Sequence, residues 1–169
     1  MSSIQDLIVE IVALSGGRLV GRTRMQKTVY LLDARGLKSG ATYYYYNFGP
    51  FSDEVANGIS DGKFAGSLLE KIGYRVSDGS PFSVFETRKG AEQVAALGNL
   101  TQSDAKRLLD QLTAANSIVL ELAATIHWLV FAERVSDWRT ELKKRKGAKT
   151  ESGRVDKAVS LLSTLGFAV

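Results

Sequence analysis

One stretch of the chain, residues 22–55, constrains the fold more than any other, because three clearly marked elements follow each other in it. A basic amphipathic helix is expected from about Thr23 to Ala34, and a tyrosine-rich strand from Thr42 to Phe48. Gly49 and Pro50 end the strand, and Ser52 followed by two acidic residues is a typical helix start. The stretch therefore predicts a helix, a strand and a second helix in that order.

The segments on either side extend this pattern. Ser3 is placed to cap a helix with apolar residues at helical spacing, which ends at Gly16-Gly17. The helix that starts at Ser52 is expected to reach Ile72, with glycines that divide it into two short pieces near Gly62. Strands at 74–77 and 82–87 flank a turn-forming segment and predict a β-hairpin. We therefore expect an α+β protein whose residues 1–100 form a winged helix-turn-helix core, with this hairpin as its wing.

From Lys89 onward the sequence predicts helices only. They are expected at 91–97, at 103 to about 135, from Ser136 onward, and at 155–165. The polar, glycine-flanked segment 147–153 is the most linker-like part of the chain, but it is too short to separate independent domains. Residues 101–169 are therefore expected to be a C-terminal helical extension packed on the core.

Composition excludes several classes of protein. The chain has 169 residues with 44% hydrophobic content, enough for one buried core, and no cysteine, so disulfides, thiolate metal sites and cysteine nucleophiles are absent. The first residues lack the basic and apolar regions of a signal peptide. The longest apolar segment, Leu120 to Ala132, falls short of the ~20 residues that cross a bilayer. We expect a cytoplasmic protein with no membrane partner.

The net charge of +4 permits a polyanionic partner without requiring one. The basic residues gather at 18–38 and at 139–149. In the first cluster, Arg22, Arg24 and Lys27 lie within about one helical turn, where they are candidates for phosphate contacts. The candidate nucleic-acid-binding residues are therefore Arg22, Arg24, Lys27, Asn57, Lys63 and Arg75. The alternative is a solvated face, and the acidic start of the helix after Ser52 argues against base reading.

The second basic cluster is a candidate for binding a partner. Lys143, Lys144 and Arg145 lie near Trp138, a residue type enriched at interface hot spots. A solvated helix end, where cations favour the helix dipole, is the alternative.

Two aromatic features have structural explanations as well as functional ones. The run Tyr43 to Tyr46 could stack on bases, but alternate residues of a strand face opposite sides, so two tyrosines are expected in the core and two at the surface. His127 is the only histidine and lies in an apolar segment, so we expect a core or interface residue rather than a catalytic base.

Nothing in the sequence matches a catalytic or nucleotide-binding motif. The adjacent Asp53 and Glu54 are typical capping residues rather than metal ligands. We therefore expect no enzyme, no cofactor and no metal.

Three segments together resemble a known family. Arg22-Thr-Arg-Met-Gln-Lys-Thr-Val-Tyr-Leu-Leu, Tyr46-Asn-Phe-Gly-Pro-Phe-Ser-Asp-Glu-Val and Phe85-Glu-Thr-Arg-Lys-Gly are similar to motifs of the YwgA-like proteins and, more distantly, of the Panacea antitoxin domain. Phe48 and Phe51 stand where those families commonly have tyrosine. The resemblance covers most of the chain and implies a winged-helix-like prokaryotic protein linked to phage, toxin-antitoxin or defence contexts.

Two functions follow as expectations. The first is a non-enzymatic, DNA-associated regulator or antitoxin-like module that binds double-stranded DNA through its basic faces and wing. The alternative is a protein-interaction adaptor, with a toxin or regulatory protein as partner, in which the winged helix is only a scaffold and the C-terminal helices are the docking surface. A homodimer is compatible with either function.

Overall fold

Three helices from the first part of the chain form the base of the molecule, α1 (Ile4–Leu14), α2 (Arg22–Ala34) and α3 (Asp53–Phe64). The computed structural model describes residues 2–169. The Ser3 hydroxyl accepts a hydrogen bond from the Asp6 amide at 3.1 Å, which confirms the predicted start of α1. The Ser52 hydroxyl accepts one from the Val55 amide at 3.3 Å and caps α3 in the same way.

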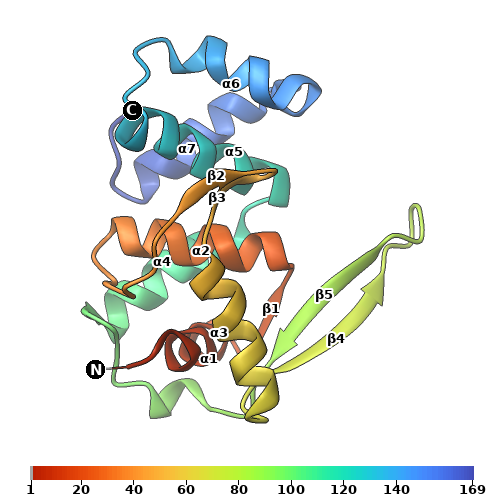
Figure 1. Cartoon of the computed structure of the whole chain (residues 1–169), viewed down its shortest axis with the longest axis vertical. Helices are drawn as coiled ribbons and strands as arrows, with labels where there is room; N and C mark the ends of the chain where they lie inside the picture. Colours follow the sequence, from red (N-terminus) through yellow and green to blue (C-terminus); the bar gives the residue numbers. More distant parts are fainter. Residues whose placement is uncertain (1) are drawn as a thin grey trace.

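A three-stranded antiparallel sheet lies beside these helices. Its order is β1-β5-β4, from β1 (Arg18–Val20), β5 (Pro81–Glu86) and β4 (Leu69–Tyr74). The β4–β5 hairpin projects away from the helices, and β4 is on its outer side (Figure 1). The expected helix up to Ile72 is wrong: α3 ends at Phe64, because Gly66 takes a positive φ of 78° and turns the chain into β4. Strand β1 was not expected from the sequence.

A second hairpin connects α2 to α3. Its strands are β2 (Tyr44–Tyr46) and β3 (Gly49–Phe51), which pair antiparallel. Gly49 and Pro50 were expected to end a single strand, but they lie in the returning strand, and the chain reverses at Asn47 and Phe48.

The C-terminal half is helical, with α4 (Gln102–Ala114), α5 (Ser117–His127), α6 (Trp138–Lys146) and α7 (Arg154–Thr164). A π-helical turn, Trp128–Ala132, extends α5. Single 3₁₀ turns lie at Ala91–Gln93 and Gly147–Thr150, and the strands β6 (Ala96–Leu97) and β7 (Leu100–Thr101) form a small pair.

The predicted helix from 103 to 135 is two helices, α4 and α5, which meet at an angle of 120°. The break is at Asn116, whose side chain accepts hydrogen bonds from the Ile118 and Val119 amides and so starts a new helix. The predicted helix at 91–97 is also wrong, because only its first turn is helical before β6 begins.

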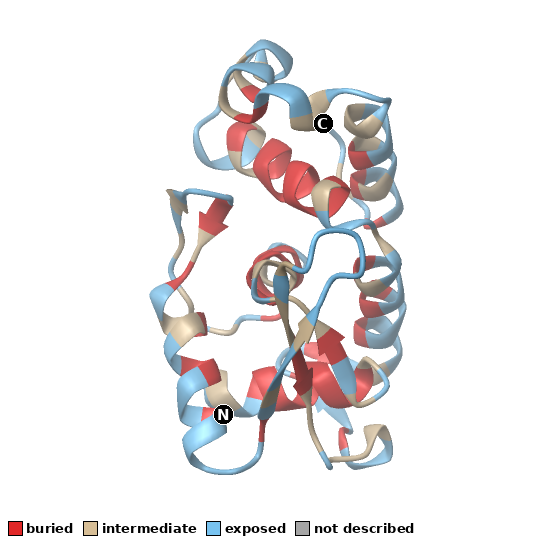
Figure 2. Ribbon diagram, turned by 90° about the vertical axis from the view of Figure 1, so that its right-hand side faces the viewer, coloured by how far each residue is buried: buried red, intermediate tan, exposed pale blue. Residues whose placement is uncertain are grey.

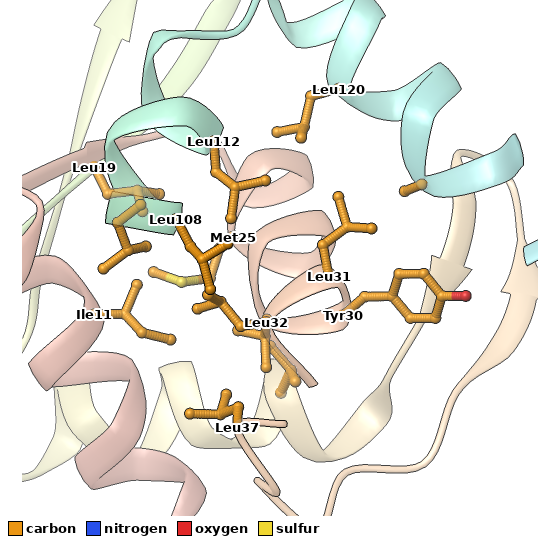
Figure 3. Packing of buried hydrophobic residues seen from close by; sticks show 14 of the residues in the cluster. Ile11, Leu19, Met25, Tyr30, Leu31, Leu32, Leu37, Leu108, Leu112 and Leu120 are labelled. Carbon is orange, nitrogen blue, oxygen red and sulfur yellow. The ribbon is translucent and has the colours of Figure 1, made fainter. Parts of the chain in front are cut away.

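One hydrophobic cluster runs through both halves of the chain. Figure 3 shows Leu108 and Leu112 of α4 beside Met25 of α2, with Leu120 of α5 on the other side of α2. Helix α5 packs on α2 and on α7, so it connects the first helices to the last one. The fold is therefore α+β, predominantly helical, with small antiparallel sheets.

In residues 2–169, no single helix has the length and apolar character needed to cross a bilayer, and the one combination that does, α4 with the extended α5, is sharply bent.

Candidate binding groove

Arg22, the first residue of α2, and Lys63 of α3 share one carboxylate as their ion-pair partner. Arg22 donates two hydrogen bonds to Glu70 of β4, at 2.7 and 2.6 Å, and the Lys63 Nζ donates a third at 2.7 Å. The hydrogen bonds from Arg22 lower the pKa of Glu70 to about 2. Glu70 therefore stays charged and holds α2, α3 and β4 together, so Arg22 and Lys63 are brought to one place as a structural ion cluster.

Arg24 is partly buried and ties neighbouring elements together. Its guanidinium donates to the Val20 carbonyl of β1 at 3.1 Å and to the Leu112 carbonyl at the end of α4 at 2.8 Å. Burial lowers its pKa from the ordinary value. Since these carbonyls occupy the guanidinium, Arg24 is not a free phosphate ligand.

The expectation that Lys27 shares an exposed basic face with Arg22 and Arg24 is wrong. Only 1% of Lys27 is exposed, and its Nζ donates to the Pro50 carbonyl of β3 at 2.9 Å. Burial lowers the pKa of Lys27 to about 8, and the nearby charge of Lys146 acts in the same direction. The β2–β3 hairpin covers the side of α2 that carries Lys27, so this lysine is buried against the hairpin.

Gln26 completes the attachment of this hairpin. Its amide donates to the Ser52 carbonyl at 3.0 Å and accepts from the Ser52 amide at 2.9 Å. Gly49 packs so tightly that a Cβ there would lie 2.7 Å from the Thr125 Oγ1 of α5. The Gln-Lys and Gly-Pro-Phe-Ser segments noted in the sequence are therefore the two halves of one structural attachment, which we call the β2–β3 latch (Gln26, Lys27, Gly49, Pro50 and Ser52).

Cations of the C-terminal layer hold the hairpin from the other side. The Arg145 guanidinium lies 4.6 Å from the Tyr45 ring centroid, and the Lys149 Nζ lies 5.1 Å from that of Phe48. Buried Glu121 accepts hydrogen bonds from Lys146 at 3.1 Å and from Lys149 at 3.1 and 3.0 Å. The hairpin is thus enclosed between α2 and the C-terminal helices.

The predicted partner-binding residues separate into two groups. Arg145 also binds Glu133 and Glu141, and Trp138 is half-buried, so both are used inside the protein. Lys143 and Lys144 are exposed on α6.

The other two predicted nucleic-acid-binding residues are exposed on different elements. Asn57 lies on α3, where Asp53 and Asp61 are exposed as well, and Arg75 follows β4 on the projecting hairpin. Acidic side chains on α3 would repel phosphates that approached Asn57.

Two adjoining hollows open at the N-terminal end of α2, which points toward the viewer in the centre of Figure 2. The larger, about 970 Å³, lies between this end, the β4–β5 hairpin and the start of α5. The smaller, about 220 Å³, lies between the β2–β3 hairpin and α3. They share Arg22, Thr23 and Phe48, and we call the combined surface the α2 groove.

The walls of the α2 groove combine apolar surface with positive charge. Its exposed or half-buried apolar side chains are Tyr46, Phe48, Phe51, Ile72, Phe82 and Ile118. The cations Arg22, Arg24, Arg75 and Lys149 line the larger hollow, and so does Glu121, the carboxylate that pairs with Lys149. Gly21 gives α2 no side-chain cap, so the positive end of that helix faces the same space. This chemistry suits an extended chain that carries apolar and acidic groups.

The tyrosine run follows the expected alternation. Tyr43 and Tyr45 are half-buried, whereas Tyr44 and Tyr46 are exposed. Tyr43 packs edge-on against Tyr30, with 5.0 Å between the ring centroids.

His127 is buried, as the sequence predicts, and its Nδ1 lies 2.7 Å from the Tyr30 hydroxyl. Burial lowers the pKa of His127 to about 4. The neutral His127 ring accepts a hydrogen bond from the Tyr30 hydroxyl. The pair therefore joins α5 to α2 next to Tyr43, which packs on the Tyr30 ring.

Within residues 2–169, no three His, Cys, Asp or Glu side chains gather as a metal site requires. No protein-family model matches the chain, and no curated protein is significantly similar to it. The resemblance to the YwgA-like proteins therefore stays a prediction. Sequence reasoning missed Phe48, Ile72, Phe82 and Ile118 as site residues, because they come from four separate segments whose proximity no local pattern encodes.

Proposed function

We propose that the protein is a non-enzymatic interaction module that binds an extended segment of a partner protein in the α2 groove. The observation that carries this proposal is the groove itself, in which aromatic and aliphatic side chains from two hairpins and α5 line two adjoining hollows together with Arg75 and with two cations, Arg22 and Lys149, that also pair with Glu70 and Glu121. Burying such side chains against a partner supplies affinity, while the cations select for acidic residues.

The groove matches a segment of defined chemistry. An apolar side chain would enter the smaller hollow between Tyr46, Phe51 and Ile59. A carboxylate further along the segment would meet Arg75, for which no carboxylate within salt-bridge distance is found in residues 2–169. The segment is therefore expected to carry an aromatic or aliphatic residue followed or preceded by an acidic one.

The order of elements supports a scaffold role for the first half of the chain. The succession α1-β1-α2-β2-β3-α3-β4-β5 with sheet order β1-β5-β4 supports a winged-helix-like scaffold, in which the β4–β5 hairpin would be the wing and the β2–β3 hairpin an insertion between α2 and α3. Two of the three segments that carry the family resemblance contain the residues that form the β2–β3 latch. A toxin or a regulatory protein is the kind of partner that the resemblance implies.

A peptide selection tests the proposal. Immobilised protein is offered a display library of random 12-residue peptides, and the affinity of an enriched peptide is measured by fluorescence anisotropy. We expect enriched peptides to combine an apolar with an acidic residue, and Phe48→Ser or Arg75→Ala to weaken binding at least tenfold.

Phe64→Ser is the matched control, because Phe64 is 97% exposed and lies outside the groove, so this variant should bind as the parent does. If no peptide is enriched, or if enriched peptides bind Phe48→Ser and the parent equally, the groove is not the binding site.

DNA association is the second candidate, favoured by the exposed cations Lys71, which also pairs with Glu86, and Arg75 on the projecting hairpin. It is tested by anisotropy with random-sequence duplex DNA at low and moderate salt. Salt-sensitive binding that Lys71→Ala/Arg75→Ala abolishes would favour DNA, and no binding at low salt would exclude non-specific DNA association. This double variant is more informative than one at Lys27, since removing Lys27 damages the β2–β3 latch.

A further inference from the structure

The outer strand of the β4–β5 hairpin has an unusual surface for a sheet edge. Ile72 and Tyr74 of β4 are 54% and 68% exposed, and Val76 just beyond the strand is fully exposed. In Figure 2 most of this hairpin lies in front of the molecule in the colours of exposed and intermediate residues. An exposed edge with apolar side chains is a template for pairing with another strand.

The hydrogen-bond pattern shows which backbone groups of β4 face this edge. The Ser83 carbonyl accepts a hydrogen bond from the Gly21 amide at 2.8 Å, so Ser83 turns its backbone toward β1. Ile72 lies directly opposite Ser83 in the β4–β5 ladder. Opposite residues of an antiparallel pair turn their backbone groups either toward each other or both away. The amide and carbonyl of Ile72 therefore point to the free edge, as do those of Glu70 and Tyr74.

We propose that two copies of this chain pair through β4, antiparallel and centred on Ile72, to form one six-stranded sheet of order β1-β5-β4-β4-β5-β1. The occupant of the edge is a second copy because β4 is complementary to itself about a two-fold axis. Ile72 lies opposite the partner's Ile72 and exchanges two backbone hydrogen bonds with it, and Tyr74 lies opposite the partner's Glu70.

Charge selects this register over its neighbours. Centred on Ile72, the pairing sets Lys71 opposite the partner's Gly73, where there is no side chain to clash with it. A register centred on Gly73 would set Lys71 opposite the partner's Arg75, and one centred on Lys71 would oppose two lysines, both of which are destabilising. A register centred on Tyr74 would run past the end of β4 into the turn at Val76.

The position of the hairpin leaves room for a second copy. It projects from the body of the molecule, and β4 is its outer strand, which is close to α3 only at its base (Figure 1). The association uses the backbone edge of β4, whereas the α2 groove uses the Ile72 side chain on the face of the hairpin. Because the association is measured by mass and by cross-linking without any peptide, either proposal can fail while the other holds.

Sedimentation velocity at tens of micromolar protein tests the association. We expect a species of twice the monomer mass of 18.4 kDa for the parent, and a dissociation constant at least tenfold higher for Ile72→Lys. Phe64→Lys is the matched control, since it replaces another exposed apolar residue away from the strand and should leave the dimer intact. A parent that sediments as a monomer, or an Ile72→Lys variant that dimerises equally well, overturns the proposal.

Single cysteines test the register, because the chain contains none of its own. Directly opposite residues of such a pair have Cα atoms about 5.5 Å apart, within reach of a disulfide. Ile72→Cys should therefore form a covalent dimer under mild oxidation. Tyr74→Cys should not, because its copies would be four residues or about 13 Å apart along the strands. Cross-linking of both variants to the same extent, or of Tyr74→Cys alone, overturns the register.

Discussion

The two larger hairpins of this protein are both antiparallel, with strands of three residues in β2–β3 and six in β4–β5, but they are attached to the body of the molecule in opposite ways. The β2–β3 hairpin has polar side chains of α2 beneath it and cations of the C-terminal layer above it. The β4–β5 hairpin is fixed at its base by Glu70 and by β1, and beyond that point its apolar side chains meet solvent. The position of each hairpin is thus decided by the contacts that its side chains make with the rest of the protein, since an isolated two-stranded hairpin is only marginally stable in water.

The largest effect is expected from breaking the β2–β3 latch. Gln26→Ala leaves the buried Ser52 amide without a partner and removes one of the two hydrogen bonds to the Ser52 carbonyl, which still accepts from the Ala56 amide, so it should lower the free energy of unfolding by about 2–4 kcal/mol. Urea denaturation measures the loss. Gln111→Ala, at an exposed position of α4, is the control and should change it by less than about 0.5 kcal/mol. A Gln26→Ala loss as small as that of the control would show that the latch does not hold the hairpin.

Acid should lower the free energy of unfolding through His127. The folded pKa of about 4 lies below the ordinary 6.5, so the unfolded chain takes up the proton first as the pH falls. The contribution of His127 is complete above pH 6.5 and is lost as the pH falls through 4, to a total of about 3 kcal/mol.

Urea denaturation between pH 7 and pH 4 measures this loss. His127→Gln should remove that part of the acid dependence, whereas carboxylates such as Glu70 contribute equally to parent and variant. Parallel stability profiles for the two proteins would mean that His127 does not titrate as its burial implies.

The contact of Lys149 with Phe48 should contribute less, since both side chains are partly exposed. Lys149→Met removes both the cation over the Phe48 ring and one of the two lysines that pair with Glu121, while Lys146 still pairs with Glu121, so the expected loss of stability is about 1 kcal/mol. Thermal unfolding measures it against Lys157→Met, a change at an exposed position of α7. Equal effects of the two substitutions would assign no stabilising role to the contact.

The smallest effect is expected on the projecting hairpin. Tyr74→Ser alters a side chain that is 68% exposed, so the stability of the monomer should change by less than about 0.5 kcal/mol. Denaturation at submicromolar protein, where association is weak, is the relevant measurement. A loss above 1 kcal/mol would mean that this hairpin is attached to the body more firmly than its contacts indicate.

Several elements could be predicted from local chemistry. Ser3 and Ser52 mark helix starts that the structure confirms, because a capping hydroxyl satisfies amides only three residues away. The alternation of the tyrosine run also follows from local geometry, since successive residues of a strand face opposite sides. Asn116, by contrast, divides a predicted long helix, because the apolar pattern continues across the break.

The candidate site was predicted only in part. Arg22 and Arg75 do line the groove, but their apolar neighbours come from β2–β3, β4–β5 and α5. Lys27 shows why charge patterns mislead. A lysine in a basic run is expected in solvent, yet Lys27 is buried and donates a hydrogen bond to the carbonyl of Pro50, 23 positions further along the chain.

The sequence by itself determined the helix starts at Ser3 and Ser52, the turn-forming segment of the β4–β5 hairpin, the basic character of α2 and the absence of thiol chemistry. Those properties depend on residues within a few positions of one another, so they can be recognised without knowing the fold. Only the tertiary structure decided which cations are buried, which hairpin is latched and which is free, and where a groove opens. These properties depend on contacts between distant segments, such as Gln26 with Ser52 and Arg22 with Glu70, which exist only once the core has packed.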